Sequence, residues 1–252
     1  MIRLTFGGEG LCGFDPVPFS DSYVKLQLPP PGADYGPPFE TKQIKATRPK
    51  QQWFRQRTYT VKTWDPENRL LGIEFLTHGQ GLAGPWAASA SRGDRVQMIG
   101  PGGAYMPSPD AVWHLLAGDD AAIPAISVTL SRLAEGSTAR VFLEVEDESE
   151  VRPLDSPADI ELTWLFRRGR PHSEAGLIFE AIRGLEFPPG FPGAFIHGEA
   201  GMVRAVRKHL ILERGIPREM LSATGYWKYS RTEEGWREEK PEWKRQVELD
   251  LV

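Results

Sequence analysis

A short run of side chains near residue 57 has the chemistry to hold a flat, phosphate-bearing cofactor. Arg57, Tyr59 and Thr60 belong to the segment Arg-Thr-Tyr-Thr, which lies on a predicted strand. On a strand, Arg57 and Tyr59 point to one face. The phenol ring could stack on an isoalloxazine, and the guanidinium could meet a pyrophosphate. Thr60 could bond the flavin ring through its hydroxyl or backbone, and an ordinary half-exposed strand remains the alternative.

A glycine-rich segment, His78 to Ala87, follows the next predicted strand. Glycines let a phosphate approach the backbone, and a helix beginning near Pro85 would direct its free N–H groups and positive end at that anion. Such loops are common, so the segment indicates a phosphate site only because it follows the first motif. Together the two motifs predict a bound flavin dinucleotide.

Polar side chains also follow the predicted strands of the second half of the chain, where nucleotide folds bind their ligands. There is no G-x-G-x-x-G fingerprint. Asp119 and Asp120 would bond a ribose or cap the next helix, and Glu199 would lie beside a nicotinamide or at the positive end of a helix. These residues are Gly118, Asp119 and Asp120 after strand 112–117, and His197 and Glu199 around the end of strand 193–197.

Three arginines follow the predicted strand 160–165. Arg167, Arg168 and Arg170 could meet a 2′-phosphate, which favours NADPH over NADH as the nucleotide. A solvated turn is the alternative interpretation.

The segment 41–63 is basic in a chain that is acidic overall. It contains seven Lys or Arg residues and no Asp or Glu, namely Lys42, Lys45, Arg48, Lys50, Arg55, Arg57 and Lys62. A local excess of positive charge attracts anionic partners. The segment therefore predicts a site for an anion, with a solvated loop as the alternative.

The elements that must position these residues change character near residue 103. Up to that point short alternating segments separated by Gly and Pro predict an antiparallel barrel or sandwich. Beyond it, strands alternate with helices, as in a doubly wound parallel sheet. We expect an N-terminal antiparallel β-barrel over residues 1–107 and an α/β domain over residues 108–252. The charged end of the chain, residues 231–252, would add a helix or a strand.

Composition excludes several classes of protein. A net charge of −4 and a pI near 5.8 disfavour a general nucleic-acid binder. The single cysteine, Cys12, allows no internal disulfide and no all-cysteine iron–sulfur cluster within one chain, and we expect it to be a small buried side chain. Without a signal peptide or a long apolar run, we expect a cytoplasmic protein with no membrane span. Redox chemistry would then need an organic cofactor.

Six motifs in order resemble the siderophore-interacting protein family, the FAD-dependent ferric-siderophore reductases. They cover nearly the whole chain and are Gly7–Leu11 with Ser22–Leu26, Arg57–Thr60, His78–Ala87, Leu116–Ile126, His197–Ala200 leading into Val203, Arg204 and Arg207, and Gly225–Lys228. The resemblance implies a ferredoxin-reductase-like fold with an NAD(P)H-binding-like second domain. It implies that FAD is bound by Arg57, Tyr59, Thr60, His78, Gly81, Ala83, Gly84, Trp86 and Ala87.

The resemblance also implies a function: reduction of a ferric siderophore through FAD, with electrons from NAD(P)H or a ferredoxin-type donor. No side chain need act as an acid or base, and no permanent metal site is expected. A flavin reductase for another acceptor and a non-enzymatic ferric-siderophore binder are the alternatives. The cations expected to hold the anionic substrate are Lys42, Lys45, Arg48 and Arg55, with Lys228 or Arg231 from the C-terminal segment.

Overall fold

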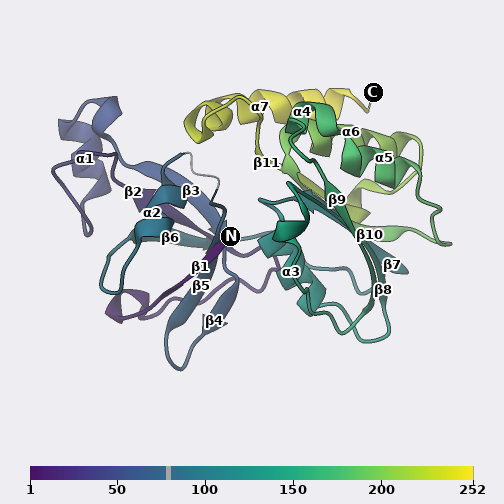
Figure 1. The fold of residues 1–252 in the computed structure, drawn as a ribbon, viewed down its shortest axis with the longest axis horizontal. Coiled ribbons are helices and arrows are strands. Elements are labelled where there is room, and N and C mark those ends of the chain that lie inside the picture. The colour runs from purple at the N-terminus through teal and green to yellow at the C-terminus, as the bar shows by residue number, and fades with distance from the viewer. Residues whose placement is uncertain (78–80, 252) are drawn as a thin grey trace. The chain divides into compact units, whose positions relative to one another are not determined.

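The computed structural model describes residues 1–77 and 81–251 of the chain. The chain divides into two compact units, Met1–Ala104 and Tyr105–Val252 (Figure 1). The first consists mainly of antiparallel strands, and the second is a parallel sheet covered by helices. The predicted fold class, an antiparallel β domain followed by an α/β domain, is therefore confirmed.

The first unit contains two three-stranded antiparallel sheets, ordered β1-β5-β4 and β3-β2-β6. Its strands are β1 (Ile2–Phe6), β2 (Tyr23–Leu28), β3 (Arg55–Thr60), β4 (Thr63–Asp65), β5 (Leu70–Phe75) and β6 (Gln97–Gly102). Along the chain, the short helix α1 (Thr41–Thr47) comes between β2 and β3, and the short helix α2 (Ala83–Ser89) comes between β5 and β6. The proline-rich segment 29–38 contains neither helix nor strand.

The core of the first unit follows the two-residue period of its strands. Val24 and Leu26 of β2 and Leu71, Ile73 and Phe75 of β5 are completely buried. The expectation for Cys12 was wrong, because its side chain is exposed. It follows a single 3₁₀ turn, Glu9–Leu11, whose last residue occupies the buried position instead.

The second unit is a five-stranded parallel sheet ordered β11-β10-β7-β8-β9. The chain runs outward from β7 to β9 and then returns to the other side of β7, so the order reverses between β7 and β10. The strands are β7 (Trp113–Asp119), β8 (Thr138–Val145), β9 (Asp159–Phe166), β10 (Pro192–Glu199) and β11 (Leu221–Trp227). Ligands of doubly wound folds bind at such a reversal point, outside the carboxyl ends of the strands.

Helices cover both faces of this sheet (Figure 1). One apolar cluster joins the sheet to α3, and another joins it to α5 and α6. The helices are α3 (Ile123–Ser131), α4 (His172–Ala175), α5 (Leu177–Arg183), α6 (Ala200–Leu212) and α7 (Glu233–Leu249). Every residue of β7 and β10 is buried, as expected for central strands of a parallel sheet.

The C-terminal segment forms the long helix α7. Thr232 caps it by accepting a hydrogen bond from the N–H of Gly235, and Trp236 on its first turns is 2% exposed. Arg204 and Arg207 of α6 donate hydrogen bonds to groups at the other end of α7. These two arginines therefore join α6 to α7.

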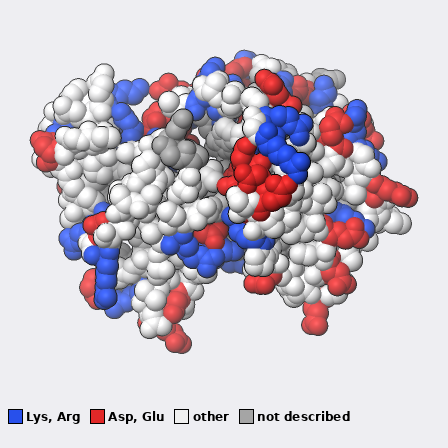
Figure 2. Space-filling view, in the orientation of Figure 1, with Lys and Arg blue, Asp and Glu red and all other residues white. Residues whose placement is uncertain are grey.

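Basic and acidic side chains are mixed over the face of the molecule drawn in Figure 2. Within the described parts of the chain, no helix combines the length and apolar character needed to cross a bilayer.

The packing at the centre of the parallel sheet gives a first prediction. Phe195 of β10 is completely buried, with its ring 4.7 Å from that of Tyr105, whereas Phe191 just before the strand is 48% exposed. Phe195→Ala should lower the unfolding free energy of the second unit by about 3–5 kcal/mol, through lost burial and a cavity. Phe191→Ala should change it by about 0.5 kcal/mol. Urea unfolding followed by circular dichroism measures both, and equal losses would contradict the assigned core.

Candidate functional site

The predicted flavin-contacting side chains lie together on β3, at the edge of its sheet. Arg57 and Tyr59 are two residues apart on that strand, and Thr60 follows them. All three side chains are half-buried. The guanidinium of Arg57 donates to the carbonyl of Gln56 (2.8 Å), and the ring of Tyr59 lies 4.4 Å from that of Phe75. One side of Tyr59 thus rests on the core of the unit.

The glycine-rich segment leads into α2, which begins at Ala83, two residues before the predicted start at Pro85. Gly81 has φ +80°, a conformation that favours glycine. A Cβ on Gly84 would lie 2.8 Å from the carbonyl oxygen of Leu76, so glycine is needed for α2 to pack on the end of β5. His78 lies outside the described residues.

One face of α2 packs on the core of the unit. Ala83 and Ala87 are buried. The ring of Trp86 is parallel to that of Phe6 (6.4 Å) and 5.9 Å from that of Phe75. These contacts pack Trp86 on the core of the unit. The first turn of α2 has no side-chain cap among the described residues, so its N–H groups are not bonded by a side chain of that part of the chain.

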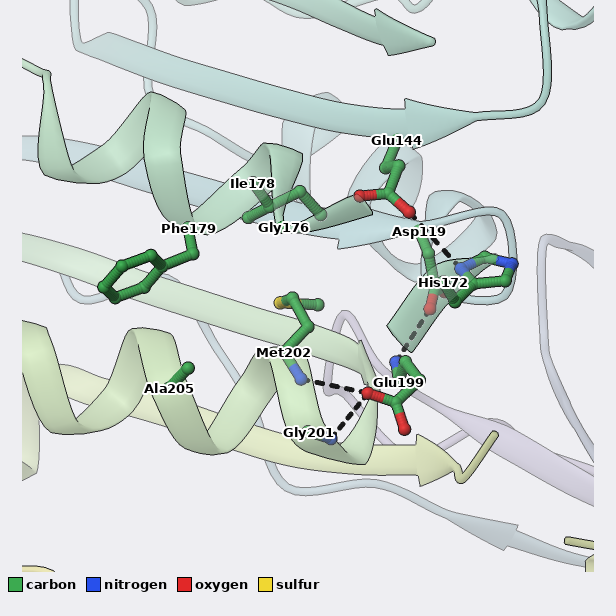
Figure 3. A pocket seen from close by; sticks show the side chains of 10 residues that line it. All are labelled: Asp119, Glu144, His172, Gly176, Ile178, Phe179, Glu199, Gly201, Met202 and Ala205. Atoms are coloured by element: carbon green, nitrogen blue, oxygen red, sulfur yellow. Dashed lines mark hydrogen bonds and ion pairs between the residues drawn. The ribbon is translucent and has the colours of Figure 1, made fainter. Parts of the chain in front are cut away.

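The second unit has a cavity of about 340 Å³ at the carboxyl ends of β7, β8 and β10 (Figure 3). Three carboxylates and one imidazole line it on the polar side. Its residues are Asp119, Glu144, His172, Gly176, Ile178, Phe179, Glu199, Gly201, Met202 and Ala205. The cavity lies beside the point where the strand order reverses, which is where the sequence predicted a nucleotide site.

Asp119 connects the ends of three strands. Its Oδ2 accepts hydrogen bonds from the N–H of Glu199 (2.7 Å) and from Nε1 of Trp227 (2.8 Å), and its Oδ1 accepts one from the N–H of Ala121 (3.0 Å). Burial raises the pKa of this carboxyl, while the donors act in the opposite direction. Gly198, with φ +137°, allows the carboxylate to approach the end of β10.

Glu199 caps α6. Its Oε2 accepts hydrogen bonds from the N–H groups of Gly201 (2.6 Å) and Met202 (3.0 Å), and its Oε1 accepts one from Tyr229 (3.2 Å). This is the helix-end position that the sequence allowed for Glu199.

Gly118 has a packing role, because a Cβ there would lie 2.5 Å from both the Cβ of Ala122 and the carbonyl oxygen of His197.

Arg167 is not available to a 2′-phosphate. It is 5% exposed, and its guanidinium forms ion pairs with Asp120 (3.1 Å), Glu144 (3.6 Å) and Glu146 (3.3 Å). Burial and the neighbouring charge of Glu150 raise the pKa of Asp120 to about 7, although Arg167 opposes the shift. The strand end thus holds a buried ionic cluster instead of an exposed cation.

The two other arginines after β9 are also engaged. Arg168 forms an exposed ion pair with Glu148. Arg170 donates to the backbone carbonyls of Arg167 (3.2 Å) and Phe166 (3.5 Å). The preference for NADPH that these arginines suggested has no support in their contacts.

His197 does not present its ring to a ligand. The imidazole is 2% exposed, stacks on Phe195 at 3.6 Å, and lies with Nε2 2.9 Å from Oγ of Ser222. Burial, assisted by the charge of Lys240, lowers its pKa to about 3. His197 is therefore a buried, neutral side chain that packs on Phe195 of its own strand and lies beside Ser222 of β11.

The predicted substrate cations differ in how they are engaged. Lys42 and Lys45 of α1 are exposed and form no ion pair with the described residues, and Nζ of Lys45 lies 5.4 Å from the ring centre of Phe54. Arg48 pairs with Asp34, and Arg55 donates to three backbone carbonyls of its own loop.

In the second unit, Lys228 and Arg231 both pair with Glu239 of α7, which reduces their joint positive charge.

Sequence reasoning missed Glu144 and His172, which line the cavity, and Trp227, which contacts His172. Nδ1 of His172 lies 3.3 Å from Oε1 of Glu144, and the His172 ring meets that of Trp227 edge-on at 4.7 Å. Glu144 could have been noticed as a carboxylate inside the apolar run 141–145; the other two gave no comparable signal. No group of three or more potential metal ligands is found among the described residues.

Comparison with known proteins adds a family match over both units. A model described as siderophore-interacting FAD-binding domain matches residues 1–105, and one described as siderophore-interacting protein matches residues 111–230. Ferric vibriobactin reductase ViuB of Vibrio cholerae is 33% identical over 243 residues, 95% of this chain and 88% of that protein.

A second relative, the NADPH-dependent ferric-chelate reductase of Escherichia coli, is 28% identical, covering 89% of this chain and 86% of that protein. The crystal structure of a siderophore utilization protein from T. fusca aligns with a TM-score of 0.79 and 32% identity, over 91% of this chain and 87% of that one.

The buried cluster around Arg167 gives the second prediction. Arg167→Ala should lower the unfolding free energy of the second unit by about 3 kcal/mol, because it leaves the buried carboxylates of Asp120 and Glu144 without their cation. The control is Arg168→Ala, which removes a neighbouring exposed pair and should have little effect. Thermal or urea unfolding compares the two variants. Similar small losses in both would show that Arg167 is not a structural cation.

Proposed function

Because the chain belongs to the siderophore-interacting protein family, we propose that it is an FAD-dependent reductase that removes iron from ferric siderophores as Fe(II). The observation that carries the proposal is the grouping of Arg57, Tyr59 and Thr60 on β3 in the unit that matches the FAD-binding model. Relatives over nearly the whole chain include proteins named as ferric vibriobactin reductase and ferric-chelate reductase.

The groups of the first unit fit FAD. Tyr59 provides an aromatic surface supported from behind by Phe75, and Arg57 provides a forked cation on the same face of β3. The uncapped first turn of α2 supplies N–H donors of the kind that bind phosphates. The other residues proposed for this site are Thr60, His78, Gly81, Ala83, Gly84, Trp86 and Ala87.

When bound, FAD supplies the redox chemistry, since flavins can take up electrons in pairs and release them singly. The protein then needs to hold the cofactor and the ferric complex close together. The protein need not coordinate iron. The hard oxygen donors of a siderophore hold Fe(II) less strongly than Fe(III), so the reduced metal is released from the siderophore.

We assign attraction of the substrate mainly to Lys42 and Lys45. Many siderophores bind Fe(III) through anionic oxygens, and these two exposed ammonium groups form no ion pair in the described structure. Arg48 and Arg55 shape the loop around them through Asp34 and backbone carbonyls. Lys228 and Arg231 are less effective candidates because they share Glu239.

The electron donor in this proposal is NAD(P)H or a ferredoxin-type protein, and the place of action is the cytoplasm, where released Fe(II) would be used. The similarity to an NADPH-dependent ferric-chelate reductase supports the nucleotide donor.

The central experiment is anaerobic. The FAD-loaded protein is reduced with dithionite just to completion and mixed with a ferric siderophore in the presence of an Fe(II)-specific chelator. We expect the oxidised flavin band to return as the coloured Fe(II) chelate forms, with two Fe(II) per flavin because FAD carries two electrons. Separate trials with NADH and NADPH identify the donor. A protein that does not retain FAD, or a reduced flavin that ferric siderophore does not oxidise, would refute the proposal.

The role of α1 is tested by charge neutralisation. Lys42→Gln with Lys45→Gln should raise KM for an anionic ferric siderophore by about fivefold at low salt and weaken its salt dependence, with kcat nearly unchanged. Two exposed residues in the C-terminal half of α7, Lys244 and Arg245, provide a control of equal charge when both become Gln. If the control raises KM as much as the α1 variant, the effect reflects net charge and the assignment to α1 is wrong.

A further inference from the structure

The carboxyl edge of the parallel sheet contains the groups that usually receive a dinucleotide. In doubly wound folds the pyrophosphate lies at the point where strand order reverses, on the free N–H groups of a helix that begins there. In this chain the reversal point lies between β7 and β10, and α6, a helix of 13 residues, starts directly after β10. The cavity of about 340 Å³ opens beside that helix start.

The N–H groups at this position are already bonded to a carboxylate of the chain. Glu199 accepts from Gly201 and Met202, the donors that a phosphate would use, at 2.6 and 3.0 Å (Figure 3). Asp119 in turn accepts from the N–H of Glu199 and of Ala121. An incoming phosphate must therefore displace a carboxylate before it can bond to the helix.

The charge around the cavity also disfavours the binding of a phosphate. The carboxylates of Asp119, Glu144 and Glu199 line it together with the imidazole of His172, and Arg167, the arginine that pairs with Glu144, is shared among three carboxylates. A dinucleotide carries two negative charges on its pyrophosphate, and NADPH carries more on its 2′-phosphate. Like charges at close range disfavour its binding.

We propose that Glu199 is an internal competitor for the phosphates of a nicotinamide dinucleotide, and that it keeps the affinity of this crevice for such nucleotides low. The inference rests on the proposed function and deepens it by naming the residue that limits binding of the nucleotide donor. Glu199 acts on recognition of the donor; electron transfer to iron does not involve it.

The test is equilibrium binding to the FAD-loaded protein by isothermal titration calorimetry. The probes are ADP and NAD⁺, which carry the pyrophosphate, and adenosine, which does not. Glu199→Gly uncovers the N–H groups of Gly201 and Met202, and glycine is well tolerated at a helix N-cap. We expect ADP and NAD⁺ to bind about tenfold more tightly than to the unaltered protein, with adenosine unchanged.

Two further variants separate charge from structure. Glu199→Gln removes the negative charge but keeps an oxygen acceptor for the helix, so its gain in affinity should be smaller. Glu135→Gln makes the same change in net charge on an exposed residue before the amino end of β8, and should leave ADP binding unaltered. A gain in affinity is informative because a damaged fold would lower binding, not raise it.

The inference is overturned if the unaltered protein binds ADP at micromolar concentration, or if both Glu199 variants bind it no more tightly than Glu135→Gln does. Should Glu199→Gly lose its folded circular dichroism spectrum, Glu199→Gln alone decides, and no gain over Glu135→Gln then overturns the inference. Oxidation of dithionite-reduced flavin by ferric siderophore needs no nucleotide. Its failure would refute the proposed function, whatever the nucleotide titrations show.

Discussion

The buried carboxylate of Asp119 is the interaction on which the architecture of the second unit depends. It ends β7, accepts hydrogen bonds at the ends of β10 and β11, and accepts one from the turn that starts α3. A buried anion is tolerated only when donors surround it, so these strand ends must meet in one arrangement. Gly118 and Gly198 permit that approach, because side chains there would clash with neighbouring atoms.

Charge is distributed unevenly between the two units. In the second unit the strand ends are acidic, and Arg167 is neutralised within a buried cluster. In the first unit, α1 presents Lys42 and Lys45 without acidic partners in the described structure. A net charge of −4 conceals this difference. In our proposals α1 attracts the anionic ferric complex, and the carboxylates at the parallel sheet weaken the binding of a dinucleotide.

Strand and helix positions could be predicted because they follow local periodicity and punctuation by Gly and Pro. The candidate site could be predicted only in part. Arg57 and Tyr59 share a face of β3 as their spacing requires. Arg167 and His197 were each chosen by residue type at a strand end, and the structure buries both. Neither burial nor partners brought from distant segments can be inferred from type alone.

The sequence by itself determined the order of an antiparallel β domain and a doubly wound α/β domain, because alternation, helical runs and turn residues act over short distances. It also determined that α1 is basic. The tertiary structure alone decided which charged groups face a ligand. Asp120 meets Arg167 across 47 positions, and Asp119 meets Trp227 across 108. Such pairings depend on strand order and on burial, which convert exposed-looking charges into internal ion pairs and helix caps.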